Sequence, residues 1–192
     1  MWAAFERLWS NEHRKAEASD RLQPEVKGLE AAAIEDIDSF LEAARRADAQ
    51  GHSPWVLRDE VRLATLRRAL EFTVQRGQWL QREGSDIVRW QGRLLKLRHG
   101  EGPSLGMLLV CRPDEEAAWQ LRFFYIRPEW QGSGHGERLL RAARYSLSGV
   151  PLHARLPLDC RAAVSSLERA GFTRMQINAF KVASFEASAE WD

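Results

Sequence analysis

The sequence predicts one β-sheet with helices on both of its faces, in an α/β or α+β domain. Apolar residues recur at helical spacing through most of the first half of the chain. Three strand-like segments then follow one another, separated by the turn clusters EGPS and PDEE. After these, helical and strand-like segments alternate. This order of elements is typical of a sheet that is layered between helices.

The first half of the chain is predicted to be helical. Helices are expected over residues 1–20, from Pro24 to Gly51, and from Leu57 into the low 80s. Gly51 is placed to end the second helix, and His52-Ser53-Pro54 breaks the chain after it. We therefore predict two units, a helical N-terminal extension over residues 1–52 and a main domain over residues 53–192.

The second half carries the sheet. Strands are predicted in DIVRWQGRLLKLRHG (86–100), SLGMLLVCRP (104–113), AAWQLRFFYIRP (117–128), PLHARLPL (151–158) and the strand-like tail 173–185. Two helices lie between them, from about Gly134 to Leu147 and from about Arg161 to Arg169. Gly171 ends the second of these helices.

Composition narrows the class of protein. The formal net charge of the 192 residues is +1, which argues against a nucleic-acid-binding or membrane-surface protein because both usually carry a basic excess. Two cysteines, Cys111 and Cys160, favour a reducing compartment over a disulfide framework. No signal-like or membrane-spanning apolar stretch is present. We expect a cytoplasmic protein without a metal ion.

The stretch WQGSGHGERLL (130–140) places three glycines between a predicted strand and a predicted helix. A dinucleotide fingerprint requires G-x-G-x-x-G, whereas the spacing here is G-x-G-x-G, and a P-loop requires a Gly-Lys-Ser/Thr that is absent. Two interpretations remain. The glycines either form a tight turn only, or they let main-chain N–H groups at a helix N-terminus approach a phosphate.

Two motifs together favour the second interpretation. Gln131-x-x-Gly134-x-Gly136 after the strand end Ile126-Arg127-Pro128 resembles the acetyl-CoA-binding motif of the GNAT N-acetyltransferase superfamily. AAVSSLERAGF (162–172) is similar to the second signature of the same family. The resemblance covers about residues 104–172. It implies a mixed, mostly antiparallel central sheet, preceded here by the helical N-terminal segment.

The resemblance also implies a coenzyme site. The strand before the glycine turn separates from the next strand in this family, and its exposed main chain binds the pantetheine arm. The expected coenzyme-binding residues are Phe124, Tyr125, Ile126, Gln131, Gly132, Ser133, Gly134, His135 and Gly136. Arg138 and Arg141 either add charge near the phosphates or form a solvated helix face. Acetyl-CoA is therefore expected as the co-substrate.

The general acid is where the sequence departs from the family. Acetyl transfer needs a neutral amine, a stabilised oxyanion and a protonated leaving thiolate. The family's tyrosine, which reaches the sulfur, corresponds to Leu167, and its usual asparagine corresponds best to Cys160. Candidate catalytic residues are Tyr125, Cys160 and His153; each has an alternative interpretation, as a half-buried strand aromatic, a small buried residue and a surface histidine, respectively.

We therefore expect an acetyl-CoA-dependent N-acetyltransferase that acts on a primary amine of a small molecule, a peptide or a protein, by direct attack in a ternary complex. The alternative is a catalytically silent coenzyme-binding or interaction domain. The family's first strand is hard to find, and SPWVLR (53–58) is the only short candidate. The last hairpin looks abbreviated, so the sheet end is expected to be an open rim or the edge of a homodimer.

Overall fold

The computed structural model describes residues 29–98, 100 and 102–190, so the helix expected over residues 1–20 lies outside the described residues. The sheet has eight strands in the order β1-β3-β4-β5-β6-β8-β7, with β2 also paired to β3. Only β5 and β6 pair in parallel, so the predicted mixed, mostly antiparallel sheet is confirmed. The strands are β1 (Glu30–Ala31), β2 (Gln78–Glu83), β3 (Asp86–Arg98), β4 (Ser104–Arg112), β5 (Trp119–Ile126), β6 (Leu152–Pro157), β7 (Thr173–Ile177) and β8 (Val182–Ala187).

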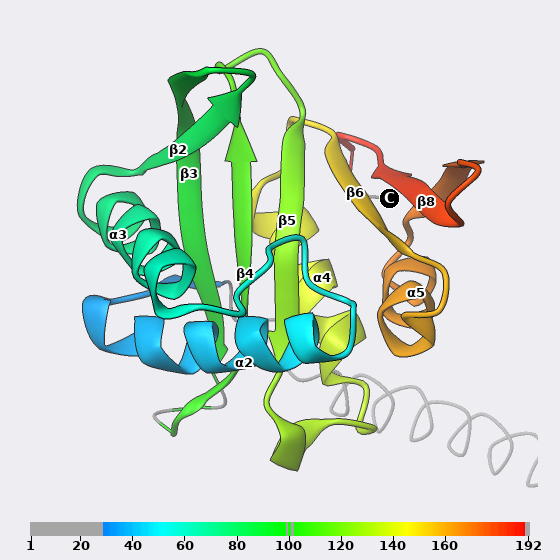
Figure 1. Ribbon diagram of the computed structural model, residues 1–192. Helices are drawn as coiled ribbons and strands as arrows, with labels where there is room; N and C mark the ends of the chain where they lie inside the picture. The colour runs from blue at the N-terminus through cyan, green and yellow to red at the C-terminus, as the bar shows by residue number, and fades with distance from the viewer. Residues whose placement is uncertain (1–28, 99, 101, 191–192) are drawn as a thin grey trace, which may run out of the picture.

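Helices cover both faces of the sheet, as predicted (Figure 1). Helices α2 (Ile37–Ala49) and α3 (Glu60–Arg76) lie on one face, and α4 (His135–Ser146) and α5 (Arg161–Arg169) lie on the other. The fully buried Phe40 of α2 packs edge-on against Phe123 of β5, with ring centroids 5.4 Å apart. Within the described residues, no helix is long and apolar enough to cross a membrane.

Helix α3 is shorter than predicted, because Gly77 ends it. Gly77 has a φ of +66° and its N–H donates to the carbonyl of Thr73, which is a left-handed helix cap. The next residues form β2, in which Trp79 is buried and Leu80 is exposed. That alternation of burial belongs to a strand, so the expectation of helix into the low 80s is wrong.

The outer edge of the sheet also differs from the prediction. The segment 53–58 forms no strand; Glu30 and Ala31 form β1 instead, paired with Lys96 and Leu95 of β3. Pro24 lies outside the described residues. Within them, the predicted second helix begins only at Ile37, after a 3-10 turn. Asp36 holds this junction, because its carboxylate accepts from Ala33 N–H (2.8 Å) and pairs with Lys96 Nζ (2.7 Å).

The last hairpin is complete rather than abbreviated. Strand β8 pairs with β6 on one side and with β7 on the other, so both strands fit after α5. Asn178 makes the connection short, because its side-chain oxygen accepts from the N–H groups of Phe180 and Val182 (3.0 Å each). β7 is the edge strand, and the homodimer stays a prediction. The division of the chain at residue 52 also stays a prediction, although α2 shares a core with the sheet.

The centre of the sheet opens where β5 leaves β6. Their parallel pairing covers only Trp119 to Leu121 with Leu152 to Ala154. The register between β4 and β5 shifts at the same level, because Leu109 pairs with Phe123 and Val110 with Leu121. Arg122 is therefore the extra residue of a β-bulge, which bends β5 away from β6. Figure 1 shows the two strands close together at one end and apart at the other.

Candidate active site

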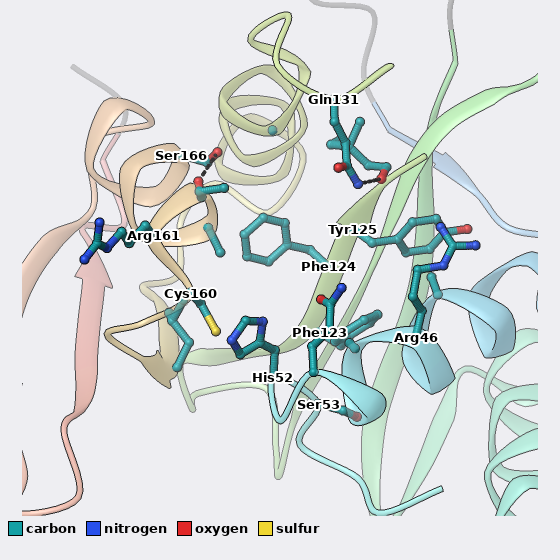
Figure 2. A pocket seen from close by; sticks show the side chains of 18 of the residues that line it. Arg46, His52, Ser53, Phe123, Phe124, Tyr125, Gln131, Cys160, Arg161 and Ser166 are labelled. Carbon is teal, nitrogen blue, oxygen red and sulfur yellow. Dashed lines mark hydrogen bonds between the residues drawn. The ribbon is translucent and has the colours of Figure 1, made fainter. Parts of the chain in front are cut away.

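A cleft of about 1290 Å³ occupies the opening between β5 and β6. This volume exceeds the roughly 300–1,000 Å³ of an ordinary small-molecule pocket, so the cleft has room for an extended ligand. Its lining comes from six regions: α2 with the loop after it, β5, the glycine turn, β6, α5 with the residues just before it, and the start of β8 (Figure 2). Elements from both faces of the sheet therefore meet at one site.

The main chain of β5 forms one wall. Phe124, Tyr125 and Ile126 all line the cleft, beyond the last pair of β5 with β6. Their pairing with β4 continues from Phe124 with Leu108 to Ile126 with Gly106. The edge of β5 that faces away from β4 therefore presents main-chain groups to the cleft. Figure 2 shows Phe124 and Tyr125 projecting to opposite sides of the strand.

The glycine turn lies at the end of this wall. Gly132 and Gly134 have φ values of +80° and +79°, and a Cβ added at either would meet no atom within 4 Å. The space beside both residues is thus open to a ligand. Helix α4 begins next, and its first bond runs from Arg138 N–H to Gly134 O (3.1 Å). The N–H groups of Gly136 and Glu137 consequently have no intrahelical partner.

The turn is held by two further contacts. The Gln131 side chain donates to the carbonyl oxygen of Ile126 (2.9 Å), which ties the turn to the end of β5 (Figure 2). A Cβ on Gly136 would lie 2.6 Å from Ser166 Oγ of α5, so this glycine permits close helix packing. Of the expected coenzyme residues, all but Ser133 line the cleft.

The two arginines of α4 differ in their contacts. Arg141 Nη2 lies 3.0 Å from Glu137 and donates to the carbonyl oxygen of Arg169. Arg138 is not among the residues that line the cleft. The contacts of Arg141 favour its helix-face interpretation. The Nε atom of Arg138 is buried without a hydrogen-bond partner, so neither interpretation of Arg138 is supported.

Tyr125 is the candidate proton donor on β5. It lines the cleft, and its hydroxyl oxygen is buried without a hydrogen-bond partner in the structure. Burial raises the pKa of this phenol well above its ordinary value, so the hydroxyl is protonated at neutral pH. The ring packs against Phe40 with centroids 6.0 Å apart. A buried donor without an acceptor is available to a ligand.

Cys160 lies at the other side of the cleft, immediately before α5 (Figure 2). Burial, and to a smaller extent the Asp159 carboxylate, raise the pKa of its thiol to about 11. His52 joins this pair, with Nε2 3.8 Å from Asp159 Oδ2. The ligand atoms of the three residues lie within 4.8 Å of one another, which is compact enough for a metal ion. The expectation of a metal-free site therefore stays a prediction.

His153 is not brought to the cleft with the other candidates. It is exposed on β6 and pairs with Glu186 of β8, with Nε2 3.5 Å from the carboxylate. Its strand neighbours Ala154 and Arg155 line the cleft, but His153 does not. A catalytic role for His153 stays an untested prediction.

Leu167, at the position of the family's tyrosine, is fully buried in the core between α5 and the sheet. It is absent from the cleft lining, whereas Ser166 and Ala163 of the same helix line it. The side chain at residue 167 therefore points into the protein interior rather than toward the cleft.

Several cleft residues carry no signal in the sequence, and His52 and Arg122 are two examples. His52 belongs only to a predicted chain break, because nothing in the spacing indicates that it meets Asp159, which is 107 residues later. Arg122 belongs to a stretch that predicts a regular strand. Its place in a bulge depends on the register with β4, which a single strand's sequence does not display.

Comparison with solved structures identifies this architecture. The spermidine N-acetyltransferase from Vibrio cholerae, in complex with CoA and spermine, matches with a TM-score of 0.59 and 14% identity over 83% of this chain and 93% of that one. RimL, the ribosomal L7/L12 alpha-N-protein acetyltransferase, matches in its CoA complex with a TM-score of 0.56 and 16% identity over 83% and 92%. No family model and no curated protein sequence matches this chain. Both structures are of N-acetyltransferases, and the chain has the GNAT fold that its two motifs predicted.

Proposed function

We propose that this protein transfers an acetyl group from acetyl-CoA to a primary amine. The observation that carries the proposal is the separation of β5 from β6 beside a glycine turn at a helix N-terminus. The open turn at Gly132 and Gly134 fits a pyrophosphate, because donors and the helix dipole converge there. The exposed edge of β5 fits an extended pantetheine arm.

In this proposal the chain's own groups do three things. The main-chain N–H groups of Phe124 and Ile126, which face away from β4, stabilise the carbonyl oxygen, which gains negative charge as the amine attacks. Tyr125 and Cys160, both protonated at neutral pH, are available as proton donors to the departing sulfur. The amine attacks as the neutral base, and the proton that its nitrogen loses replaces the one given to the sulfur, so that the products are the amide and the free thiol. The raised pKa of Cys160 also favours direct attack in a ternary complex, since a protonated thiol is a poor nucleophile. When bound, acetyl-CoA supplies the activated thioester.

Isothermal titration of the folded protein with acetyl-CoA tests the coenzyme site. Micromolar binding is expected, and absence of binding at high micromolar ligand would refute the proposal. Thiol release from acetyl-CoA across a panel of amines and peptides then tests transfer.

The second candidate is a coenzyme-binding protein without catalytic activity. The observation that favours it is that Leu167 stands at the position of the family's tyrosine and is buried, so no proton donor reaches the cleft from residue 167. Binding of acetyl-CoA without thiol release for any acceptor supports this candidate. Turnover with one acceptor eliminates it.

A further inference from the structure

Two arginines flank the point where β5 and β6 separate. Leu121 and Ala154 are the last paired residues of the two strands, and Arg122 and Arg155 come directly after them. Leu121 and Ala154 belong to the core on the α4 and α5 side. Side chains alternate along a strand, so Arg155 projects to the opposite face. Arg122 is the bulge residue, at which this alternation is interrupted, but its charge acts on the Cys111 thiol, which belongs to the core on that opposite face. Both arginines line the cleft.

Neither guanidinium is neutralised by the described residues. No hydrogen bond or ion pair joins Arg122 or Arg155 to another side chain in this part of the chain, and the Nε atom of Arg122 is buried without a partner. Leaving the Nε donor of Arg122 buried without an acceptor is costly, whereas Arg155 is exposed on β6 and open to a ligand from solvent. Like charges on neighbouring strands also repel. The pair therefore has the character of an anion-binding site that the chain itself does not fill.

The acidic side chains of the cleft are already engaged. Glu42 pairs with Arg46 (2.6 Å), Glu129 with Arg127 (3.7 Å) and Asp159 with His52 (3.8 Å). These three are the acids that line the cleft. On β8, Glu186 pairs with His153. Among the described residues, the cleft thus has no unpaired carboxylate that would bind a polycation.

The anion is not a phosphate seated in the glycine turn. Arg122 precedes Ile126 by four residues, which is about 13 Å along a strand, and the turn lies beyond Ile126. Arg122 is instead two residues, or about 7 Å, from Phe124, in the stretch of main chain assigned above to the carbonyl oxygen. A group held by the arginines would therefore sit close to the reacting amine.

We infer that the acceptor is an amino-acid-type amine whose carboxylate is held by Arg122 and Arg155. This inference rests on the proposed function, since it names the substrate class of the same site. Arginine suits the role because its planar guanidinium binds a carboxylate through two hydrogen bonds. The site differs in this respect from one that would bind a polyamine.

The test compares acceptors that differ only in that carboxylate. Thiol release is measured with glycine, L-methionine and L-glutamate, with the α-amide of each, and with spermidine. The wild-type protein is expected to favour the free α-carboxylate over the α-amide of the same amino acid by at least about tenfold in kcat/KM. Equal rates with the amides, or a preference for spermidine, would overturn the inference.

Variants assign the preference to the two arginines. Arg122→Gln and Arg155→Gln are expected to reduce the carboxylate-to-amide ratio to about one to two, with the Kd of acetyl-CoA unchanged within about twofold. Arg161→Gln is the matched control, because Arg161 also lines the cleft but lies at the start of α5, and it should retain the ratio. Equal loss toward both acceptors in the Arg122 and Arg155 variants would contradict the inference.

A binding measurement separates this inference from the proposed function. The same acceptor pairs are titrated into the protein saturated with coenzyme A, with tryptophan fluorescence as the readout. Carboxylate-selective binding that is lost in Arg122→Gln, without turnover, refutes transfer and supports the inference. Turnover without carboxylate selectivity supports acetyl transfer and refutes the inference about the acceptor.

Discussion

The two ends of the cleft are built to bind in different ways. At the proposed coenzyme end, the glycine turn offers main-chain N–H groups and open space, with Gly134 in a left-handed conformation. At the opposite end, where β5 and β6 part, charged side chains from separate strands converge, led by Arg122 and Arg155. The first end depends on the local conformation of a few consecutive residues. The second depends on the register of three strands.

The same difference separates the proposed coenzyme end, which depends little on side chains, from an end whose ligand preference depends on them. Main-chain groups at a helix N-terminus recognise a phosphate with little dependence on side chains. A side-chain site at the strand separation changes its preference when one residue changes. The solved structures with this fold include one in complex with CoA and spermine, whereas the cleft described here presents unpaired arginines.

The largest effect on binding is expected from a substitution at the proposed coenzyme end. Gly134→Glu places a carboxylate and a strained left-handed residue where a pyrophosphate is proposed to lie, so coenzyme A affinity should fall at least about 100-fold. Isothermal titration with coenzyme A measures the loss.

Gly149→Glu is the matched control for that change. Gly149 also has a left-handed φ, +87°, with no atom within 4 Å of an added Cβ, but it lies beyond the other end of α4. Both variants should lose a similar stability, about 1–2 kcal/mol, while only Gly134→Glu loses the coenzyme. Similar affinities in the two variants would count against a phosphate seat at the turn.

The next largest effect is expected on stability, from a substitution in the core under α5. Leu167→Tyr forces a larger polar residue into a fully buried position, so the free energy of unfolding should fall by about 1–3 kcal/mol. Urea unfolding measures this change, and Leu167→Met, which conserves volume, should cost less than about 1.5 kcal/mol. A stable Leu167→Tyr protein with faster thiol release would indicate that residue 167 reaches the cleft after all.

The smallest effect concerns the Cys160 thiol. Asp159→Asn removes the lesser of the two causes that raise its pKa, so the pKa should fall from about 11 while staying above that of an exposed thiol. Thiolate absorbance against pH, in a Cys111→Ser background, measures it. An unchanged or higher pKa would contradict the assigned contacts.

The raised pKa values of the two cysteines predict how the stability of the protein changes at alkaline pH. Burial raises the folded-state pKa of Cys111 and of Cys160 from 9.0 to about 11. The folded state therefore holds these protons more tightly than the unfolded state does. The corresponding stability is complete below pH 9 and is lost as the pH rises toward 11.

Several features were predictable from the sequence because their causes are local. The strands over 86–100, 104–113 and 117–128, the helix after Gly134 and the glycine turn before it depend on periodicity, glycine conformation and spacing within short stretches. The GNAT fold followed from two such motifs about 40 residues apart. Gly77 shows the limit of such local signals. The helical spacing of apolar residues continues past Gly77, but its left-handed conformation ends α3, and β2 begins at the next residue.

Tertiary structure decided the rest, because those features depend on residues that are far apart in the chain. Strand pairing placed Glu30 and Ala31 at the sheet edge and made Arg122 a bulge residue beside Arg155. Packing brought His52 to Asp159 and turned Leu167 into the core. The sequence by itself thus determined the fold and the proposed coenzyme end of the cleft. Long-range pairing decided which charges meet at the other end, because register and burial are set only when the whole sheet assembles.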